Sequence, residues 1–277
     1  MAANPATRRL APPSGRIRLA LQAATTVALA AFLIVPVGMS VLAGVTRNDF
    51  VGLRSGLTLD WIEQVWTMYR GAIGLSLQVA LATLAVALLA GVPCGYALSR
   101  SRSRMSRLIE RALMLPVAMP GLASALGLIV VYGGQRDFRT SAWFIVVGHV
   151  VFTLPFMVRS VAAVCAAIDL RTLEEGAASL GAGFARRLRT VVLPNIRPGI
   201  VAGALTVVTL SIGEFNLTWM LSTPMTKTLP VGLADAYASL RLEVGSAYTL
   251  IFFLMIVPLL VLMQRVGVNN PTQRSPR

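Results

Sequence analysis

The sequence predicts an all-α integral membrane protein with six transmembrane helices, from its composition, the spacing of its charges and the continuity of its apolar runs. Of its 277 residues, 56% are hydrophobic and 13% are charged, whereas roughly a quarter of the residues of a soluble globular domain are charged. Six long stretches lie between charged residues and are interrupted by a single carboxylate. Because these stretches are continuously apolar and do not alternate, they predict helices and exclude a membrane β-barrel.

Each stretch is long enough, or nearly long enough, for a membrane helix. A hydrocarbon core of about 30 Å requires about 20 helical residues. The fourth stretch is the shortest, and we expect its helix to extend into its flanks. In chain order the stretches contain 28, 29, 24, 19, 29 and 21 residues and lie between Arg18 and Arg47, Arg70 and Arg100, Arg111 and Arg136, Arg139 and Arg159, Arg197 and Lys227, and Glu243 and Arg265.

The first and third stretches have particular features. Basic residues precede the first, as in a secretory signal peptide, but its apolar run is about twice the usual length for such a signal, so we expect a retained anchor. The third contains Gly121 and Gly127, which would let its helix approach a neighbour closely. Prolines at Pro116 and Pro120 are expected to serve packing rather than gating.

The basic residues indicate the orientation of the helices. They give a net charge of +14, but they cluster between the spans, which argues against a nucleic-acid partner and for a topology signal. With the N-terminus inside, 18 of the 25 basic residues lie in cytoplasmic segments, so we expect both termini in the cytoplasm. The expected parts are a cytoplasmic tail (1–18), a first transmembrane helix (19–46), a periplasmic loop (47–70), a five-helix core (71–266) that includes a long loop (162–197), and a cytoplasmic tail (267–277).

The long loop between the fourth and fifth spans has the pattern of an amphipathic helix. Asp169 or Thr172 is placed to cap its start. Leu173, Ala177 and Leu180 follow at helical spacing and would form one apolar stripe.

A bend and a second helix are expected to follow. Gly181 and Gly183 permit a sharp turn, and Pro194 is expected to end the second helix. Such a helix–glycine–helix segment fits a groove in a partner protein or a position on the lipid headgroups. The sequence pattern by itself does not favour the partner groove over the lipid headgroups.

The same loop carries a motif that resembles the EAA loop of binding-protein-dependent ABC importer permeases. That family's pattern is Glu-Ala-Ala, three residues, Gly, nine residues and then Ile-x-Leu-Pro. This chain keeps the spacing and replaces the first alanine by Gly176 and the isoleucine by Val191. The residues that match are Glu175, Ala177, Gly181, Leu193 and Pro194.

The resemblance covers about residues 70 to 266 and implies a type I importer permease of the bacterial inner membrane, surrounded by lipid. It implies three kinds of protein partner: a cytoplasmic ATP-binding subunit dimer, a second permease that is identical or homologous, and a periplasmic solute-binding protein. Within the family the chain looks most like polyamine permeases, with those for iron, thiamine, sulfate and aminoethylphosphonate close behind. The resemblance assigns ATPase coupling to Glu174, Glu175, Gly176, Ala177, Leu180, Gly181, Leu193 and Pro194.

The chain lacks the residues of an enzyme, and we expect neither a cofactor nor a metal. A P-loop requires Gly-x-x-x-x-Gly-Lys-Ser/Thr, but the only lysine, Lys227, follows Met225 and Thr226 in a segment expected outside. The single histidine, His149, has no carboxylate beside it in sequence, so we expect it to pack or hydrogen-bond. Cys94 and Cys165 lie far apart and are expected to be free thiols.

Glu214 is the carboxylate that interrupts the fifth stretch, and Asn216 follows it. A charge at this depth is usually paired or faces water. Glu214 therefore either forms a structural bond or, with Asn216, lines a translocation pathway suited to a cationic solute. The alternative to an ATP-driven importer is a gradient-driven secondary transporter that uses Glu214 as its ion or proton site.

Overall fold

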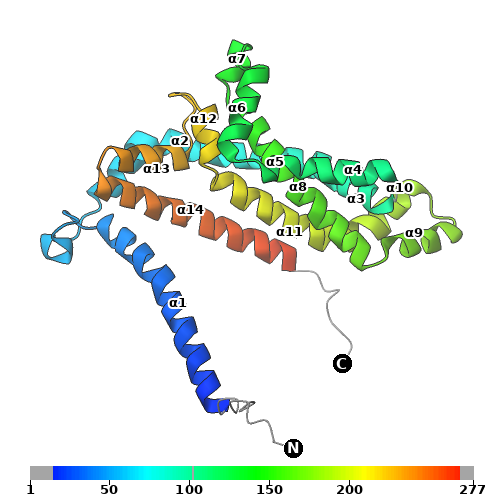
Figure 1. Cartoon of the computed structure of the whole chain (residues 1–277), viewed down its shortest axis with the longest axis horizontal. Coiled ribbons are helices and arrows are strands. Elements are labelled where there is room, and N and C mark those ends of the chain that lie inside the picture. The colour runs from blue at the N-terminus through cyan, green and yellow to red at the C-terminus, as the bar shows by residue number, and fades with distance from the viewer. Residues whose placement is uncertain (1–14, 102, 269–277) are drawn as a thin grey trace, which may run out of the picture.

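The computed structural model describes residues 15–101 and 103–268, so most of both expected tails, 1–14 and 269–277, lies outside the described residues. The described part is helical, and it contains no strand beyond one isolated antiparallel bridge between Thr46 and Leu57. Figure 1 shows the helices in space. In chain order they are α1 Gly15–Ala43, α2 Asp60–Val86, α3 Val92–Arg100, α4 Arg104–Leu113, α5 Leu115–Ala118, α6 Gly121–Tyr132, α7 Arg136–Arg139, α8 Ala142–Ala167, α9 Leu170–Ser179, α10 Phe184–Arg187, α11 Leu193–Ile212, α12 Asn216–Leu221, α13 Leu229–Ala238 and α14 Leu242–Val268, with a 3₁₀ turn at Gly52–Ser55 and π-helical turns at Ala87–Gly91 and Leu188–Val192.

The predicted all-α membrane fold is confirmed. Five helical segments of the described chain are long and apolar enough to cross a membrane: Ile17–Ala43, Asp60–Arg100, Ala142–Ala167, Phe184–Ile212 and Leu242–Arg265. A bent pair of helices supplies a sixth span if it is counted as one.

The third span differs from the expected straight helix. Its two halves, Arg104–Ala118 and Gly121–Tyr132, are bent by 106°. Met119 between them is extended (φ −90°, ψ 143°), because a residue before proline disfavours the helical region and Pro120 has no N–H to continue the helix. A Cβ on Gly121 would lie 3.4 Å from that of Asn216, whereas one on Gly127 would meet nothing within 4 Å. Of these two glycines, only Gly121 therefore lies where the helix closely approaches another segment.

The second span begins earlier than expected. Its helix starts at Asp60, within the segment expected as a loop, and runs for 41 residues to Arg100. Acidic residues in the first turn, Asp60 and Glu63, suit the positive end of the helix dipole. Trp61 Nε1 donates to the Thr46 carbonyl oxygen at 2.9 Å, so the start of α2 is tied to the segment that follows α1.

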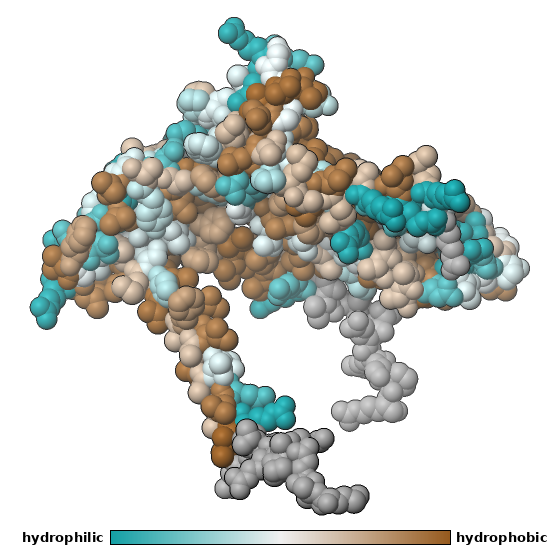
Figure 2. Space-filling view, viewed as in Figure 1, coloured by the Kyte–Doolittle hydropathy of each residue, from teal (hydrophilic) through white to brown (hydrophobic). Residues whose placement is uncertain are grey.

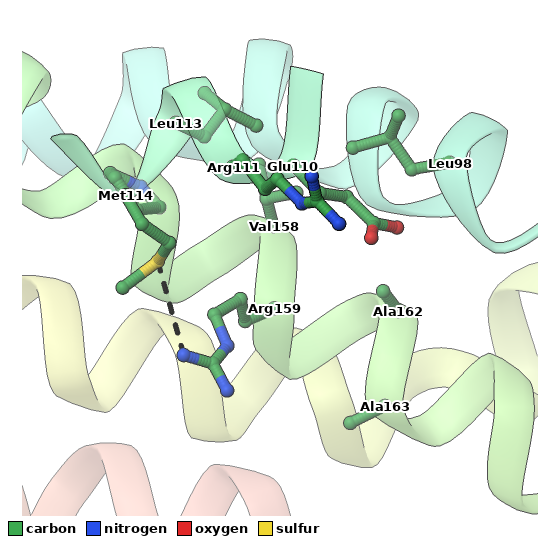
Figure 3. Close-up of a pocket in the computed structure, with 10 residues that line it drawn as sticks. Leu98, Glu110, Arg111, Leu113, Met114, Val158, Arg159, Ala162 and Ala163 are labelled. Carbon is green, nitrogen blue, oxygen red and sulfur yellow. Dashed lines mark hydrogen bonds between the residues drawn. The ribbon is translucent and has the colours of Figure 1, made fainter. Parts of the chain in front are cut away.

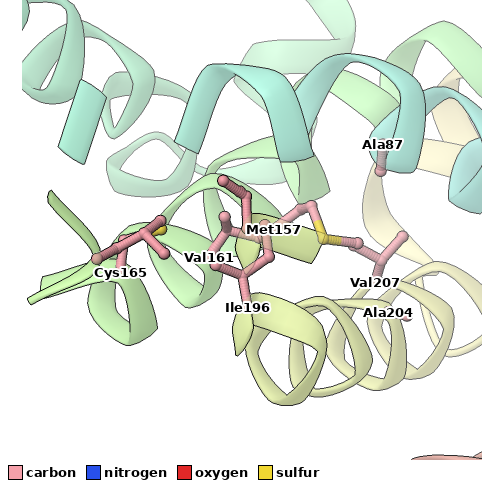
Figure 4. Close-up of a cluster of buried hydrophobic side chains, with 9 residues drawn as sticks. Ala87, Met157, Val161, Cys165, Ile196, Ala204 and Val207 are labelled. Atoms are coloured by element: carbon pink, nitrogen blue, oxygen red, sulfur yellow. The ribbon is translucent and has the colours of Figure 1, made fainter. Parts of the chain in front are cut away.

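Helices α8 and α11 form the central pair of the core. Gly199 and Gly203 on α11 let the two backbones approach, and a Cβ on Gly199 would lie 2.8 Å from the Ser160 carbonyl oxygen. Ser160 Oγ donates to the Gly199 carbonyl oxygen at 2.7 Å. Figure 4 shows Met157 and Val207 in the buried cluster that this approach creates. Small residues four apart are a common device for packing membrane helices.

Helix α1 leaves the bundle, as Figure 1 shows. Every described side chain from Ile17 to Met39 is exposed. Contact is confined to the end of the helix, where a Cβ on Gly44 would lie 2.7 Å from the Ala247 nitrogen on α14. Figure 2 shows the largely apolar surface of α1, which needs lipid or another protein around it.

Candidate functional site

The long loop between the fourth and fifth spans forms the expected helix–bend–helix. Its first helix is α9, and its second begins at Phe184 and continues into the fifth span. The connection between the two spans is shorter than the predicted segment 162–197, because α8 continues to Ala167 and the helix of the fifth span already begins at Phe184. Asp169 occupies the N-cap position of α9 with a left-handed backbone (φ 45°). Its carboxylate accepts the Thr172 hydroxyl at 2.6 Å and caps no backbone N–H.

Glu174 points into the protein. Its side chain is 2% exposed and forms an ion pair with Arg100 of α3. Its Oε1 also accepts the Tyr96 hydroxyl at 2.5 Å, and the Arg100 guanidinium lies 5.6 Å from the Tyr96 ring centroid. The resemblance assigns Glu174 to ATPase coupling, and its carboxylate is turned toward α3 rather than toward solvent. Glu174 fastens α9 to the second span.

Glu175, the glutamate of the motif, lies on an exposed side of α9. Its side chain is 62% exposed and pairs with Arg171, one turn earlier, at 2.8 Å. The hydrogen bond that Arg171 donates to the Glu175 carboxylate raises the pKa of Arg171. Gly176 and Ala177 follow in the helix, and neither is buried.

Gly181 ends α9 in a Schellman motif. Its φ is +82°, a left-handed conformation that side chains disfavour. The Gly181 N–H donates to the Ala178 oxygen at 2.9 Å, and the Ala182 N–H donates to the Ala177 oxygen at 3.1 Å. This pair of bonds is the defining feature of the motif. The glycine is therefore required by backbone geometry at the bend.

The bend presents apolar side chains to its surroundings. Leu180 is 88% exposed, Phe184 60% and Leu173 43%. The predicted apolar stripe thus faces away from the chain's own core at Leu173 and Leu180. Leu180, Gly181 and Phe184 together are called the elbow below.

The second helix of the loop does not end at Pro194, contrary to expectation. It is continuous with the fifth span from Phe184 to Ile212. The π-helical turn Leu188–Val192 precedes Leu193 and Pro194, and a wider turn of this kind accommodates a local disruption of the helical hydrogen bonds. Phe184 of the elbow therefore lies on the same continuous helix as the fifth span.

Glu214 lies at a break in that span, between α11 and α12. Its two carboxylate oxygens accept the backbone N–H groups of Leu217 (2.9 Å) and Thr218 (2.8 Å), and one also accepts the Thr218 hydroxyl at 2.9 Å. The carboxylate therefore caps α12, where the helix dipole favours a negative charge. These bonds support the structural interpretation of Glu214, while Asn216 beside it is exposed.

Replacing Glu214 by Gln is expected to lower the stability of the protein by about 1–2 kcal/mol and to leave uptake largely intact, because charge-assisted bonds to two N–H groups are lost. Thermal unfolding of the purified chain measures the first effect, with Glu63→Gln on α2 as the matched control. Unchanged stability with lost uptake would instead assign Glu214 to the pathway.

Helix α12 is held at two further points that the sequence analysis did not identify in advance. His149 on α8 bridges the break, with Nδ1 2.8 Å from Ser211 Oγ and Nε2 2.7 Å from Thr218 Oγ1, which confirms its predicted hydrogen-bonding role. Arg139 donates to the carbonyl oxygens of Leu221 (2.7 Å) and Met220 (3.2 Å). The positive charge of Arg139 suits the negative, C-terminal end of the α12 dipole, and the negative charge of Glu214 suits the positive, N-terminal end.

Arg159 does not mark the end of its helix. The charge predicts the end of the fourth apolar stretch at Arg159, but α8 continues to Ala167, about 12 Å further along the axis. Arg159 thus lies within a helix that is long and apolar enough to cross a membrane. The uncharged run from Ser160 to Ile168 was the available signal.

Residues 87–268 match the family described as the binding-protein-dependent transport system inner membrane component. The chain belongs to this family. It is therefore a multi-pass protein of the bacterial inner membrane and a permease subunit of an ABC importer. ATP hydrolysis belongs to a separate subunit of such a transporter, and nothing supports the gradient-driven alternative.

Individual relatives bear on the solute. A protein of Salmonella paratyphi A named as a 2-aminoethylphosphonate transport system permease is 26% identical, covering 92% of this chain and 96% of the relative. A protein of Haloferax volcanii named as a molybdenum ABC transporter permease is 32% identical, covering 69% and 74%. The expected kinship with polyamine permeases is therefore not supported.

Solved structures show the same fold. The permease in an inward-facing structure of the MetNI methionine ABC transporter matches with a TM-score of 0.58 and 18% identity, over 74% of this chain and 94% of that one. A chain of a bacterial ABC transporter involved in import of the acidic polysaccharide alginate matches with a TM-score of 0.70 and 14% identity, over 92% and 96%.

Proposed function

We propose that this permease binds its ATPase dimer through the elbow and forms half of the pathway for an oxyanionic solute. The observation that carries the proposal is the elbow itself. Two large apolar side chains, Leu180 and Phe184, are exposed on either side of Gly181. Gly181 forms a left-handed turn, which requires a glycine. In a groove of a partner protein, such residues would supply a buried apolar anchor.

The proposed route of coupling has two branches that leave the elbow. One passes from α9 through Glu174 to Arg100 on the second span. The other is the continuous helix from Phe184 into the fifth span. A partner that moves the elbow would thereby move two spans together. The distribution of the basic residues favours a cytoplasmic position for this loop and for both chain termini.

A second permease subunit is proposed to complete the pathway. The exposed apolar surfaces of α1 and of α6, where Leu126 is 53% and Val130 77% exposed, are available to a second copy or a related chain. A periplasmic binding protein would deliver the solute to the outer mouth. The solute class, a phosphonate or another tetrahedral oxyanion such as molybdate, follows from the names of the relatives.

Capture of the ATPase tests the elbow. The chain is co-expressed in membranes with the ATPase encoded beside it and with any second permease, and the ATPase recovered with it is measured. Gly181→Arg is expected to reduce recovery more than tenfold, because it strains the turn and places a charge between two apolar anchors.

The matched control is Gly52→Arg, which also replaces a glycine with positive φ (+62°) and open surroundings but lies in the segment expected outside. It is expected to bind the ATPase like the wild type. Absence of ATPase from a folded wild-type complex would refute the proposed coupling.

A further inference from the structure

A groove on the inner half of the molecule is lined by charged side chains from two different elements. It lies between α3, α4 and α8 and has a volume of about 540 Å³, within the range of small-molecule sites. Figure 3 shows Glu110 and Arg111 on α4 on one side and Arg159 on α8 on the other. Leu98, Pro155 and Val158 supply apolar wall between them.

The two arginines of the groove form no ion pair with any residue that the structure describes. Among the described residues, neither Arg111 nor Arg159 forms an ion pair, and the ion pairs present involve Arg100, Arg171 and Lys227. The one polar contact of Arg159 is to the Sδ of Met114, at 3.9 Å, and thioether sulfur is a weak acceptor. An unpaired charge within a membrane segment generally marks a ligand or transport path.

The chemistry of the lining specifies the kind of ligand. Guanidinium groups bind the oxygens of phosphate-like anions, often through two parallel hydrogen bonds. The carboxylate of Glu110 in the same groove accepts from an ammonium group. A ligand that carries both an oxyanion and an ammonium, with a short apolar linker, satisfies all three side chains.

We propose that this groove is a binding site for an aminoalkyl phosphonate or phosphate, held by Arg111 and Arg159 at the oxyanion and by Glu110 at the ammonium. The inference rests on the proposed function of the chain as an oxyanion permease. Two sources share this chemistry, namely the free solute and the headgroup of phosphatidylethanolamine. The groove includes Leu98, two residues before the Arg100 that holds Glu174, so an occupant lies beside the path to the elbow.

Binding to the assembled transporter tests the site. The complex with its ATPase is placed in phosphatidylcholine nanodiscs and titrated with 2-aminoethylphosphonate and with methylphosphonate, which lacks the ammonium. Arg111→Gln and Arg159→Gln are expected to weaken binding of both probes at least tenfold. Glu110→Gln is expected to weaken binding of 2-aminoethylphosphonate only. The control Arg104→Gln removes a charge from the same helix outside the groove and is expected to change neither affinity.

A second arm distinguishes the headgroup. If neither free probe binds, native mass spectrometry of the complex in phosphatidylethanolamine nanodiscs is expected to show retained lipid that Arg159→Gln loses and Arg104→Gln keeps. Equal binding of probe and lipid by all variants would overturn the proposal. The ATPase in the complex is quantified throughout, so failure of the proposed coupling appears as lost ATPase, whereas failure of this site appears as lost binding with the ATPase present.

Discussion

Replacing Glu174 by Ala is expected to reduce ATP-driven uptake about tenfold or more while the chain still reaches the membrane. The substitution removes the carboxylate that accepts both Tyr96 and Arg100 and so releases α9 from the second span. Because the Arg100 side chain is 39% exposed, the loss of stability should fall between the values for exposed and buried pairs, at about 2 kcal/mol. The larger effect is on coupling, since one of its two proposed branches is cut. Uptake into vesicles and solute-stimulated ATPase activity measure it.

A double-mutant cycle separates the pair from the individual side chains. Glu174→Gln and Arg100→Gln each leave one charge without its partner, whereas the double variant leaves two neutral groups able to hydrogen-bond. We expect the double variant to be more stable than the sum of the single effects predicts, by about 1 kcal/mol. Asp137→Ala, on α7 outside the described ion pairs, serves as a control for loss of a carboxylate. Additive effects with normal ATPase stimulation would show that Glu174 is not part of the coupling route.

The spans and the helix–bend–helix loop between the fourth and fifth spans could be predicted from the sequence because both depend on local constraints. Lipid excludes charge over about 20 residues, so the positions of the arginines mark the spans. The left-handed turn at Gly181 has a local cause as well, since glycine adopts positive φ without strain. The spacing of the motif residues along the sequence is therefore sufficient to locate the loop.

The remaining features depend on contacts between distant residues. Glu174 and Glu175 are adjacent in sequence, yet one is buried and the other exposed, because the difference is set by α3, 74 residues away. The charge of Arg159 predicts the end of a span, since a charge usually marks one, although a groove can accept such a charge within the helix. The bend at Pro120 leaves the apolar composition unchanged, so hydropathy cannot distinguish a bent span from a straight one.

Replacing Gly199 by Leu is expected to have the largest effect on folding, a loss of about 3 kcal/mol or more. Even a Cβ would lie 2.8 Å from the Ser160 oxygen and 2.9 Å from Val164 Cγ2, and the backbone oxygen cannot rotate away. The central helices α8 and α11 must therefore separate, which also breaks the Ser160–Gly199 hydrogen bond and opens the buried cluster around Met157. The yield of monodisperse protein in detergent and its thermal unfolding measure this loss.

Gly74→Leu is the matched control, because Gly74 also lies within a membrane-crossing helix but has no atom within 4 Å of its Cβ position. It should retain nearly wild-type stability, since leucine favours the helix over glycine by up to about 1 kcal/mol. If Gly199→Leu were as stable as Gly74→Leu, the close approach of α8 and α11 would not be the packing that holds the core. The fifth span would then be free to move independently of the fourth, and displacement of the elbow would not reach the groove at Arg159 through α8.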